Sequence, residues 1–479
     1  MAGMSQPTTQ PITSYAGAID YLLSFADFER SSNVRREVEE FALTRIISLL
    51  ERLGRPQDGR LTIHVAGSKG KGSTAAMIES ICRAAGYTTG LFTSPDLHGK
   101  TERIRIDGTP LSEAAFTALA ERLRPVIDDE LAVDPGRLST FEILTAMGFL
   151  AFRDATVDVQ VIEVGLGGRL DTTNVFREKA VAVVTALSRE HTEVLGDSME
   201  QIAAEKAGII TAGTQAVVLA PQRSEVAAKT VREHADDVCV PLVDVTARFC
   251  WSMAGKDWLP REDGRSLGQW IRLAAVGPTG VEADSALFLL PLLGLHQIEN
   301  AATVMATVDV LRDQGMHVPA SAVHTGLATV DWPARLEVLA SDPTLVIDCA
   351  HNEESLDRVL ESLPQYFEYE RLIIVLGILG DKDLDGMAGR IMEVADGVVV
   401  TRPDHPRAED VARTMAAFES WGGPLQTELV VSDAVRTAMK LAGPLDLVCV
   451  LGSLFTAAEA RGHIQKLAGG EPTSARADR

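Results

Sequence analysis

The chain has 479 residues, of which 46% are hydrophobic and 23% charged, so most of it can fold around buried cores and general disorder is excluded. Sixty-seven acidic against 45 basic residues leave a formal net charge of -22, which argues against a general nucleic-acid or anionic-membrane binder. The longest apolar stretches, 286–295 and 372–379, are far shorter than the roughly 20 residues of a membrane span.

Two further features concern the compartment. The N-terminal stretch has no basic residue before Arg30 and no apolar run, so we expect no secretory signal. The five cysteines are an odd number without a CxxC pair, which predicts buried free thiols and no thiolate metal site. We therefore expect a soluble cytoplasmic protein that binds neither membrane nor nucleic acid.

From residue 61 onward, runs rich in β-branched residues alternate with helical segments, a pattern typical of βα units and a parallel sheet. The strands predicted in this first series are 61–66, 88–92, 158–164, 180–187 and 215–219. Residues 244–290 contain three of the five Trp and break the rhythm, which predicts an antiparallel excursion. A helix is expected at 296–312.

A second βα series follows Trp332. Its predicted strands are 344–349, 371–376, 397–401, 428–431 and 446–451. We expect two doubly wound α/β domains, with a hinge near 330–335 where Asp331, Trp332 and Pro333 interrupt helix and strand. The predicted domains are 14–330 and 331–468, and the polar tail 469–479 is expected to be disordered.

The segment 61–73, LTIHVAGSKGKGS, predicts a phosphate-binding loop between a buried strand and a helix beginning near Thr74. Its glycines allow backbone N–H groups to approach phosphate, Lys71 supplies positive charge, and the Ser73 hydroxyl can bind Mg²⁺. The spacing matches neither the usual P-loop nor GxGxxG. A glycine-rich turn with surface lysines is the structural alternative.

Three further polar residues allow two interpretations each. Glu163 follows an apolar strand at the end where α/β sheets bind ligands, or it is a buried acid paired with a base. For His191, in a loop, the residues alone favour a surface or hydrogen-bonded role. For Lys206, beside Ala and Ile on a predicted helix, they favour a solvated lysine.

Two helix starts also carry polar groups. STFE, at 139–142, has the spacing of a capping box, which would by itself explain Ser139 and Glu142. GLHQIENAA, at 294–302, places a His-Gln-Asn cluster on a helix, where mutual hydrogen bonding competes with ligand binding as its role.

Taken together, these motifs resemble one known family. GSKGKGS is similar to the GTNGKGS loop of the folate branch of the Mur ligase superfamily, the folylpolyglutamate and dihydrofolate synthases, and the remaining motifs follow in the family's order over roughly residues 15–465. The resemblance implies an α/β fold, with a Mur-ligase-like P-loop ATPase domain containing a parallel sheet and a smaller Rossmann-like C-terminal domain.

The resemblance also implies a nucleotide and metal site. DWPARLE resembles the family's WPGR, with Ala334 in place of Gly; DCAHNE resembles DGAHNP; EKAGI contains the lysine that the family carbamylates, here Lys206. The implied ATP-binding residues are Gly67, Gly70, Lys71, Gly72, Ser73, Asn300, Arg335 and Asp348. The implied ligands of two Mg²⁺ ions are Ser73, Glu163 and His191, and the implied catalytic residues are Lys71, Lys206 and His351.

For the acceptor, the resemblance implies a pteroate or folate pocket, and the GGRLD motif at 167–171 favours dihydropteroate. The implied pocket residues are Phe41, Thr140, Phe141, Glu142, Leu170 and Asp171.

The implied activity is ATP-dependent ligation of L-glutamate to dihydropteroate, to the glutamyl tail of reduced folates, or to both, through an acyl phosphate. A single-activity enzyme is the alternative within the family, and a non-catalytic nucleotide switch or a small-molecule kinase are the alternatives outside it. The expected cofactors are ATP and Mg²⁺, with K⁺ as a further candidate, and the expected assembly is a monomer.

Overall fold

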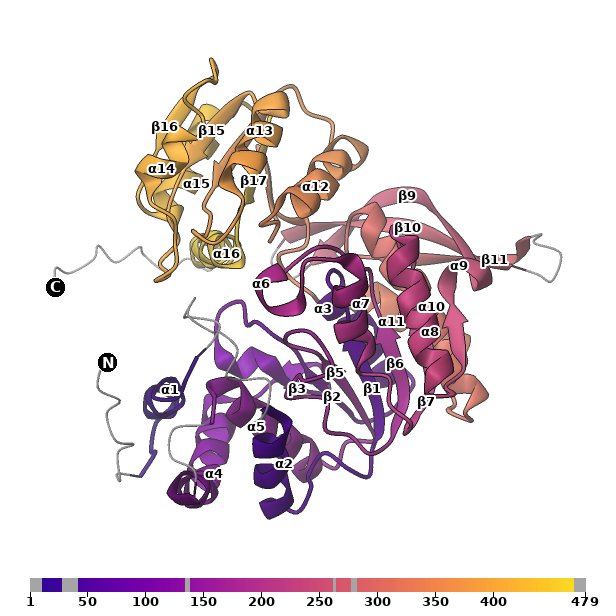
Figure 1. Cartoon of the computed structure of the whole chain (residues 1–479). Helices are drawn as coiled ribbons and strands as arrows, with labels where there is room; N and C mark the ends of the chain where they lie inside the picture. The colour runs from indigo at the N-terminus through magenta and orange to yellow at the C-terminus, as the bar shows by residue number, and fades with distance from the viewer. Residues whose placement is uncertain (1–10, 28–41, 134–137, 262–263, 277–281, 469–479) are drawn as a thin grey trace. The chain divides into compact units, whose positions relative to one another are not determined.

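The computed structural model of the chain describes residues 11–27, 42–133, 138–261, 264–276 and 282–468 (Figure 1). It contains two compact units. Unit 1 contains described residues of 1–252, 272–288 and 297–330, and unit 2 those of 253–271, 289–296 and 331–479. Phe41 and the tail 469–479 lie outside the described residues. No helix among the described ranges is both long and apolar enough to cross a bilayer.

Unit 1 is built on an eight-stranded sheet of order β4-β3-β2-β5-β1-β6-β7-β8. Its strands are β1 Leu61–Ala66, β2 Thr89–Phe92, β3 Ile104–Ile106, β4 Thr109–Pro110, β5 Val159–Glu163, β6 Lys179–Val184, β7 Thr214–Leu219 and β8 Leu242–Asp244. Neighbouring strands in the run β2-β5-β1-β6-β7-β8 pair in parallel. Strands β3 and β4 continue the sheet beyond β2 as an antiparallel edge. The central strands are buried along almost their whole length, as their continuous apolar runs require. The five predicted strands of this series are confirmed, within a few residues at their ends.

The helices of unit 1 pack against this sheet. They are α1 Tyr15–Leu23, α2 Ala42–Arg52, α3 Lys71–Ala84, α4 Glu113–Val133, α5 Thr140–Asp154, α6 Thr192–Leu195, α7 Met199–Ala207, α8 Glu225–Asp237, α9 Val245–Arg248, α10 Leu295–Asp313 and α11 Ala320–Thr329, with a 3₁₀ turn at Lys100–Arg103. Helices α2, α4 and α5 gather beside one another in Figure 1, and with α1 they share a core that includes Phe92, Ile162 and Phe176. A second core lies between α7, α8 and strands β6 and β7.

The predicted excursion is a three-stranded sheet of order β11-β10-β9, formed by β9 Phe249–Arg261, β10 Gly264–Val276 and β11 Glu282–Leu290. Only two and five residues separate these strands. Neighbouring strands joined by so few residues run antiparallel, since a parallel connection needs a dozen or more.

Unit 2 contains a six-stranded sheet of order β12-β13-β17-β14-β15-β16, parallel except for the β12 edge. Its strands are β12 Glu337–Ser341, β13 Thr344–Ile347, β14 Leu372–Leu376, β15 Gly397–Val400, β16 Leu425–Thr427 and β17 Leu447–Leu451. Its helices are α12 Glu353–Tyr366, α13 Leu384–Val394, α14 Val411–Ala416, α15 Val431–Leu441 and α16 Leu454–Ala468. The expected α/β class, a mostly parallel sheet in each series, is confirmed.

Two predictions of local structure are wrong. The strand predicted at 428–431 is the approach to α15, and the edge strand β16 lies just before it; the apolar residue Leu429 is 72% exposed and belongs to neither core. Of the five thiols, all of which are free, Cys239 is exposed and Cys250 is half-buried, so the prediction of buried thiols holds for Cys82, Cys349 and Cys449 only.

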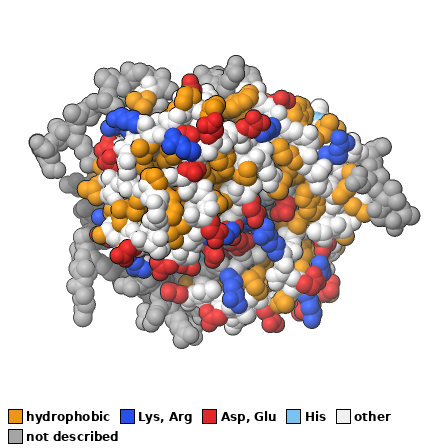
Figure 2. Space-filling model, turned by 90° about the horizontal axis from the view of Figure 1, so that it is seen from above, with side chains coloured by type: hydrophobic (Ala, Val, Ile, Leu, Met, Phe, Trp, Pro, Cys, Tyr) orange, Lys and Arg blue, Asp and Glu red, His pale blue; other side chains and the backbone are white. Residues whose placement is uncertain are grey.

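Charge is dispersed over the face drawn in Figure 2, where acidic, basic and hydrophobic side chains are interspersed. The described residues on that face form no continuous patch of basic side chains, which a nucleic-acid backbone would require.

Candidate active site

The loop between β1 and α3 requires glycine at two positions where the backbone enters the left-handed half of φ space. Gly67 has φ 149°, and a Cβ there would collide with the Thr185 hydroxyl. Gly70 has φ 83°, and a Cβ there would collide with the Asn300 amide. Neighbouring polar groups therefore approach the bare backbone of this loop directly.

Helix α3 begins at Lys71, three residues earlier than predicted, and its N-terminus has the character of an anion site. Gly70 caps it without any side-chain hydrogen bond, while Gly72 and Ser73 are buried. The first N–H groups of a helix have no partner inside it, so a buried, uncapped end calls for an external acceptor. Lys71 itself has no hydrogen-bond or ion-pair partner among the described residues.

Two buried hydroxyls near the loop also lack partners. The Oγ1 of Thr74, in the first turn of α3, and the Oγ of Ser188 make no hydrogen bond within the described part of the chain. Ser188 adjoins the loop because its carbonyl accepts from the Ser68 hydroxyl at 3.0 Å. Unpaired buried hydroxyls cost free energy unless a ligand or water completes them, so they fit a phosphate site.

The first half of the loop is tied to the segment after β6. The backbone N–H groups of Ser68 and Lys69 both donate to the carbonyl of Ala186, each at 3.0 Å. These two donors are therefore used within the protein. The N–H groups of the loop that remain for a ligand are those from Gly70 onward.

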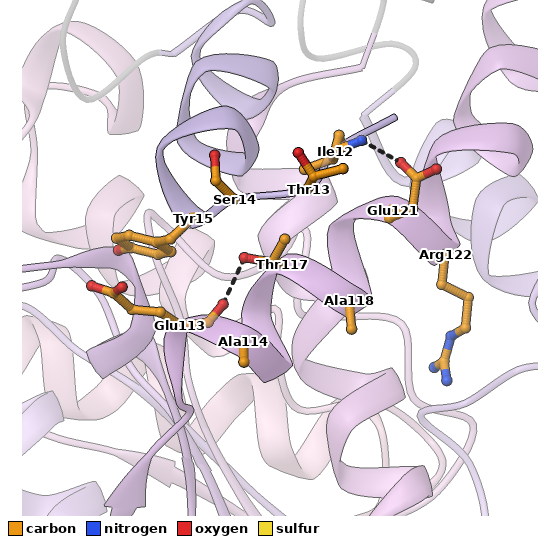
Figure 3. A pocket seen from close by; sticks show the side chains of 10 residues that line it. All are labelled: Ile12, Thr13, Ser14, Tyr15, Glu113, Ala114, Thr117, Ala118, Glu121 and Arg122. Carbon is orange, nitrogen blue, oxygen red and sulfur yellow. Dashed lines mark hydrogen bonds between the residues drawn. The ribbon is translucent and has the colours of Figure 1, made fainter. Parts of the chain in front are cut away.

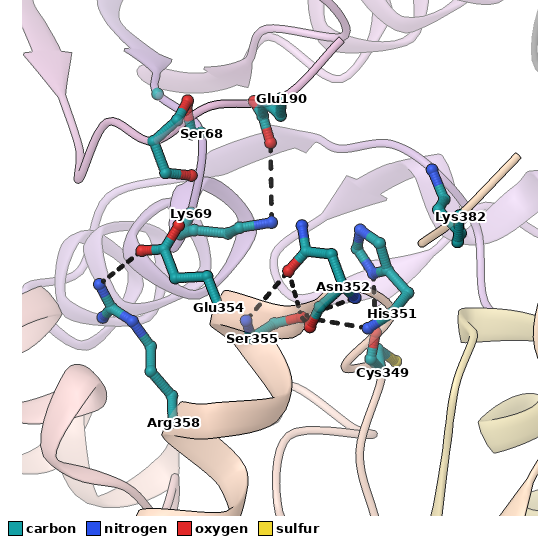
Figure 4. Close-up of polar contacts among 12 residues, drawn as sticks. Ser68, Lys69, Glu190, Cys349, His351, Asn352, Glu354, Ser355, Arg358 and Lys382 are labelled. Carbon is teal, nitrogen blue, oxygen red and sulfur yellow. Dashed lines mark hydrogen bonds and ion pairs between the residues drawn. The ribbon is translucent and has the colours of Figure 1, made fainter. Parts of the chain in front are cut away.

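A cluster of charges meets at this loop. The Lys206 ammonium donates to Glu190 at 2.9 Å and to the Gly67 carbonyl at 2.9 Å. Lys69 lies 3.7 Å from the same Glu190 carboxylate (Figure 4). Burial alone would raise the pKa of Glu190, but the nearby Lys206, Lys71 and Lys69 charges lower it to about 2. Burial lowers the pKa of Lys206 to about 8, against the opposing effect of Glu190.

These contacts overturn the interpretation of Lys206 as a solvated helix lysine, which the residues alone favoured. Its side chain is 2% exposed and reaches the phosphate loop from α7. The Ala and Ile neighbours that suggested an ordinary helix surface belong to the face of α7 that packs into a core.

Helix α10 brings its amide cluster to the same loop. The Asn300 amide donates to Gln297 at 3.0 Å, and the Gln297 amide donates to the Ser73 hydroxyl at 3.3 Å. The predicted mutual hydrogen bonding is thus present, and it links Asn300 to two predicted ATP-binding residues, Gly70 and Ser73.

The predicted metal ligands differ in burial. Glu163 ends β5 and is 4% exposed, and its Oε2 accepts the Ser94 N–H at 3.1 Å; His191 is exposed at the start of α6. No three His, Cys, Asp or Glu side chains converge in the described ranges. Oxygen donors from Glu163 and Ser73 nevertheless suit Mg²⁺, which takes one or two carboxylates together with substrate phosphates and water.

A second polar centre lies beside Gly165, in the loop after β5. A Cβ on Gly165 would collide with the Phe141 ring and lie 3.3 Å from Asp171 Oδ2. Two residues predicted to line the pteroate or folate pocket therefore lie on either side of the Gly165 backbone. Asp171 is 6% exposed, and its carboxylate accepts the N–H groups of Leu166 and Thr173, each at 2.9 Å. Burial raises the pKa of Asp171, while these donors oppose the rise.

Helix α5 begins at this centre through the predicted capping box, which is present. Glu142 accepts the Ser139 N–H at 2.7 Å and also Arg45 at 3.3 Å, and burial raises its pKa against the effect of Arg45. The Thr140 hydroxyl donates to the Leu22 carbonyl at 2.8 Å. Leu170 is half-buried.

In unit 2, Asp348 follows the carboxyl end of β13 and is 6% exposed. It accepts the N–H groups of Leu336 at 2.9 Å and Ala350 at 2.8 Å; burial raises its pKa, while the charge of Arg335 lowers it. Arg335 lies between Ala334 and Leu336, both with positive φ, so the backbone bends sharply around it.

His351 lies at the start of α12 in unit 2. Its Nδ1 lies 2.9 Å from the Cys349 carbonyl, and its backbone N–H donates to Ser355 (Figure 4).

A hollow of about 660 Å³ lies between residues 12–15 and α4 (Figure 3). None of the predicted site residues lines it. Its Glu121 carboxylate already accepts the Ile12 N–H at 2.9 Å and pairs with Arg124, so this hollow does not compete with the phosphate loop as a candidate site.

Two contributors to these centres were not predicted from the sequence. Glu190, the residue before His191, is the ion-pair partner of Lys206. Thr173, which supports Asp171, follows it by two residues, and this Asp-x-Thr spacing could have indicated a local side-chain turn.

Comparison with protein families gives two matches. The model of the Mur ligase middle domain matches residues 65–308, and the model of the Mur ligase glutamate ligase domain matches residues 334–454.

Among curated relatives, the chain is 38% identical to the dihydrofolate synthase/folylpolyglutamate synthase of Mycobacterium tuberculosis, over 86% of this chain and 82% of that protein. It is 32% identical to the Bacillus subtilis protein of the same name, over 88% and 95%. It is 41% identical to a probable bifunctional folylpolyglutamate synthase/dihydropteroate synthase of Halobacterium salinarum, of which it spans about half, 48% of the length.

Solved structures give the same result. Folylpolyglutamate synthase of M. tuberculosis, complexed with ADP and AMPPCP, has a TM-score of 0.77 and 35% identity, covering 90% of this chain and 96% of that one. E. coli FolC in complex with DHPP and ADP has a TM-score of 0.77 and 28% identity, covering 96% and 100%.

Proposed function

The chain belongs to the Mur ligase family, in the branch of the folylpolyglutamate and dihydrofolate synthases, and from this premise we propose that it is an ATP-dependent amide ligase with both activities. It joins L-glutamate to dihydropteroate and to the glutamyl tail of reduced folates. An enzyme with one of the two activities is the alternative.

One observation carries the proposal: the uncapped N-terminus of α3, where Gly72 and Ser73 are buried, beside the positive charge of Lys71. This arrangement supplies several N–H donors and one positive charge at a single point, the complement of a triphosphate. A nucleotide switch would share it. The second polar centre, at Phe141 and Asp171, supports an acceptor in addition to the nucleotide.

The chemistry follows from the weakness of a carboxylate as an acyl donor. The acceptor carboxylate attacks the γ-phosphorus of ATP, which releases ADP and gives an acyl phosphate. The amine of L-glutamate then attacks the acyl carbon, phosphate leaves, and the ammonium proton passes to solvent. Lys71 and the N–H groups of α3 stabilise the charge on the transferring phosphoryl group, because the fold holds them together at one end of the helix.

We propose that Ser73, Glu163 and His191 hold two Mg²⁺ ions, which neutralise phosphate charge when bound. Lys206 is proposed to be carbamylated. Burial and the consequent lowering of its pKa to about 8 support this, because only the neutral amine attacks CO₂. K⁺ is a further candidate cofactor.

Asn300 of α10, in unit 1, is proposed to bind the nucleotide. In unit 2, Arg335, Asp348 and His351 are the residues proposed to act on the nucleotide and the acyl phosphate. The functional domains are proposed at 14–330 and 331–468, and the protein is proposed to act as a cytoplasmic monomer. Five free cysteines support a reducing compartment.

The test is product analysis by mass spectrometry after incubation with ATP, Mg²⁺, L-glutamate and either dihydropteroate or tetrahydrofolate. We expect ADP, phosphate and a new glutamyl amide with both acceptors. Product with one acceptor only supports a single activity. A phosphorylated acceptor without amide would indicate a kinase, and nucleotide binding without turnover would indicate a switch.

A further inference from the structure

Behind the acceptor centre lies a buried histidine that the mechanism does not use. His64 is in the middle of β1, fully buried, with its ring edge-on to Phe176 at 5.6 Å between ring centres. Its Nε2 lies 2.9 Å from the Thr173 hydroxyl, which is also fully buried, and its Nδ1 has no partner among the described residues. An apolar side chain would fill this place without leaving a buried nitrogen unpaired.

The hydrogen bonds form a directed chain. The Thr173 hydroxyl also contacts Asp171 Oδ1, and the Thr173 N–H donates to the same oxygen at 2.9 Å. Both oxygens of Asp171 already accept backbone N–H groups, from Leu166 and from Thr173, so the carboxylate acts as an acceptor here. The Thr173 hydroxyl then donates its one proton to Asp171 and accepts from His64. The His64 proton is therefore on Nε2, and the order is His64 N–H to Thr173 O–H to Asp171.

We propose that His64 is a positioning residue for acceptor binding, acting through Thr173 to fix the Asp171 carboxylate beside Phe141. The inference rests on the proposed function and adds the group that orients its acceptor site. In this position the Asp171 carboxylate can only accept hydrogen bonds, and the Phe141 ring lies beside it. The pair therefore favours a ligand that has N–H donors on an aromatic ring, as a pterin has. The nucleotide loop is not on this chain of contacts, so ATP binding should not depend on it.

The test compares His64→Leu and Thr173→Val, which remove one link each, with His64→Gln and Thr173→Ser, which keep a donor at nearly the same place. The control is Thr62→Val, on the same face of β1 two residues earlier, which loses a buried hydroxyl bonded to Gln160 at 2.8 Å. For each variant, KM values for dihydropteroate and ATP, kcat and equilibrium binding of dihydropteroate are measured.

We expect His64→Leu and Thr173→Val each to raise the KM and the dissociation constant for dihydropteroate about tenfold, the loss typical of a hydrogen bond to a charged group. The KM for ATP should stay within about twofold, and His64→Gln and Thr173→Ser should restore most of the affinity. The double variant His64→Leu/Thr173→Val should bind dihydropteroate as tightly as Thr173→Val alone. The reason is that Thr173→Val already removes the hydrogen bond through which His64 acts.

A purely structural role would lower thermal stability and kcat and leave dihydropteroate affinity as in Thr62→Val; that outcome, or additive losses in the double variant, would overturn the inference. Failure of the proposed function is separately visible, because the unmodified protein would then form no glutamyl amide.

Discussion

Replacing Lys206 with methionine tests the charge cluster at the phosphate loop. In the protein without the carbamate, the substitution shortens the side chain by only one atom and removes the ammonium that pairs with Glu190 and the Gly67 carbonyl. Removing one partner of a buried ion pair costs about 3–5 kcal/mol, because the other charge stays buried. Glu190 is 12% exposed and keeps Lys69 at 3.7 Å, so we expect the lower end, about 3 kcal/mol.

The matched variants are Glu190→Gln and the double variant Lys206→Met/Glu190→Gln. If the stranded carboxylate causes most of the loss, the double variant should be more stable than Lys206→Met by about 2 kcal/mol. The assay is urea unfolding followed by circular dichroism for all four proteins. A coupling below about 0.5 kcal/mol, within ordinary additivity, would refute the assignment of a buried ion pair.

Lys206→Arg separates this structural role from carbamylation. A guanidinium keeps the positive charge but cannot form the carbamate, so stability should be largely retained while ligase activity is lost. Carbon-13 NMR after addition of labelled bicarbonate would detect a carbamate directly in the unmodified protein. Full activity in Lys206→Arg, with no carbamate signal, would show that the lysine acts only as an ion-pair partner.

Three other outcomes are expected. Lys71→Ala should fold normally but lose about 100-fold or more in kcat, as when a transition-state donor is removed; a near-normal rate would exclude the phosphate role. Glu163→Ala should raise the Mg²⁺ concentration for half-maximal rate about tenfold or more, whereas Glu142→Ala should change acceptor affinity or stability instead; equal Mg²⁺ titrations would count against Glu163. Burial lowers the pKa of Lys179 to about 7, so the unfolded chain binds more protons between pH 7 and 10 and the free energy of unfolding should rise with pH there; Lys179→Met should flatten that rise in urea titrations at pH 7 and 9.

Sequence predicted the central strands well because buried parallel strands are apolar along their whole length. It failed where an apolar residue does not pack into a core, as at Leu429 before α15. The short strands β3, β4 and β12 were not predicted, since two to five residues at a sheet edge carry little periodicity.

The candidate site divides in the same way. The phosphate loop is one continuous motif, so its residues could be named from sequence alone. The approach of Phe141 to Asp171 across Gly165, and of Lys206 to Gly67, joins residues 30 to 139 positions apart and depends on the order of strands in the sheet. Most residues of unit 1 that the resemblance identifies lie at these two centres, whereas Arg335, Asp348 and His351 belong to unit 2. In both units the contacts of these residues required the fold.

The two N–H groups that share the Ala186 carbonyl have a further consequence. They bind the first half of the phosphate loop to the segment after β6 before any nucleotide arrives, so this half is preorganised and little of its conformational entropy is lost on binding. Amide hydrogen exchange at Ser68 and Lys69 should therefore be slow in the free protein and change little with ATP. Protection gained on binding should instead begin at Gly70, the N-cap of α3.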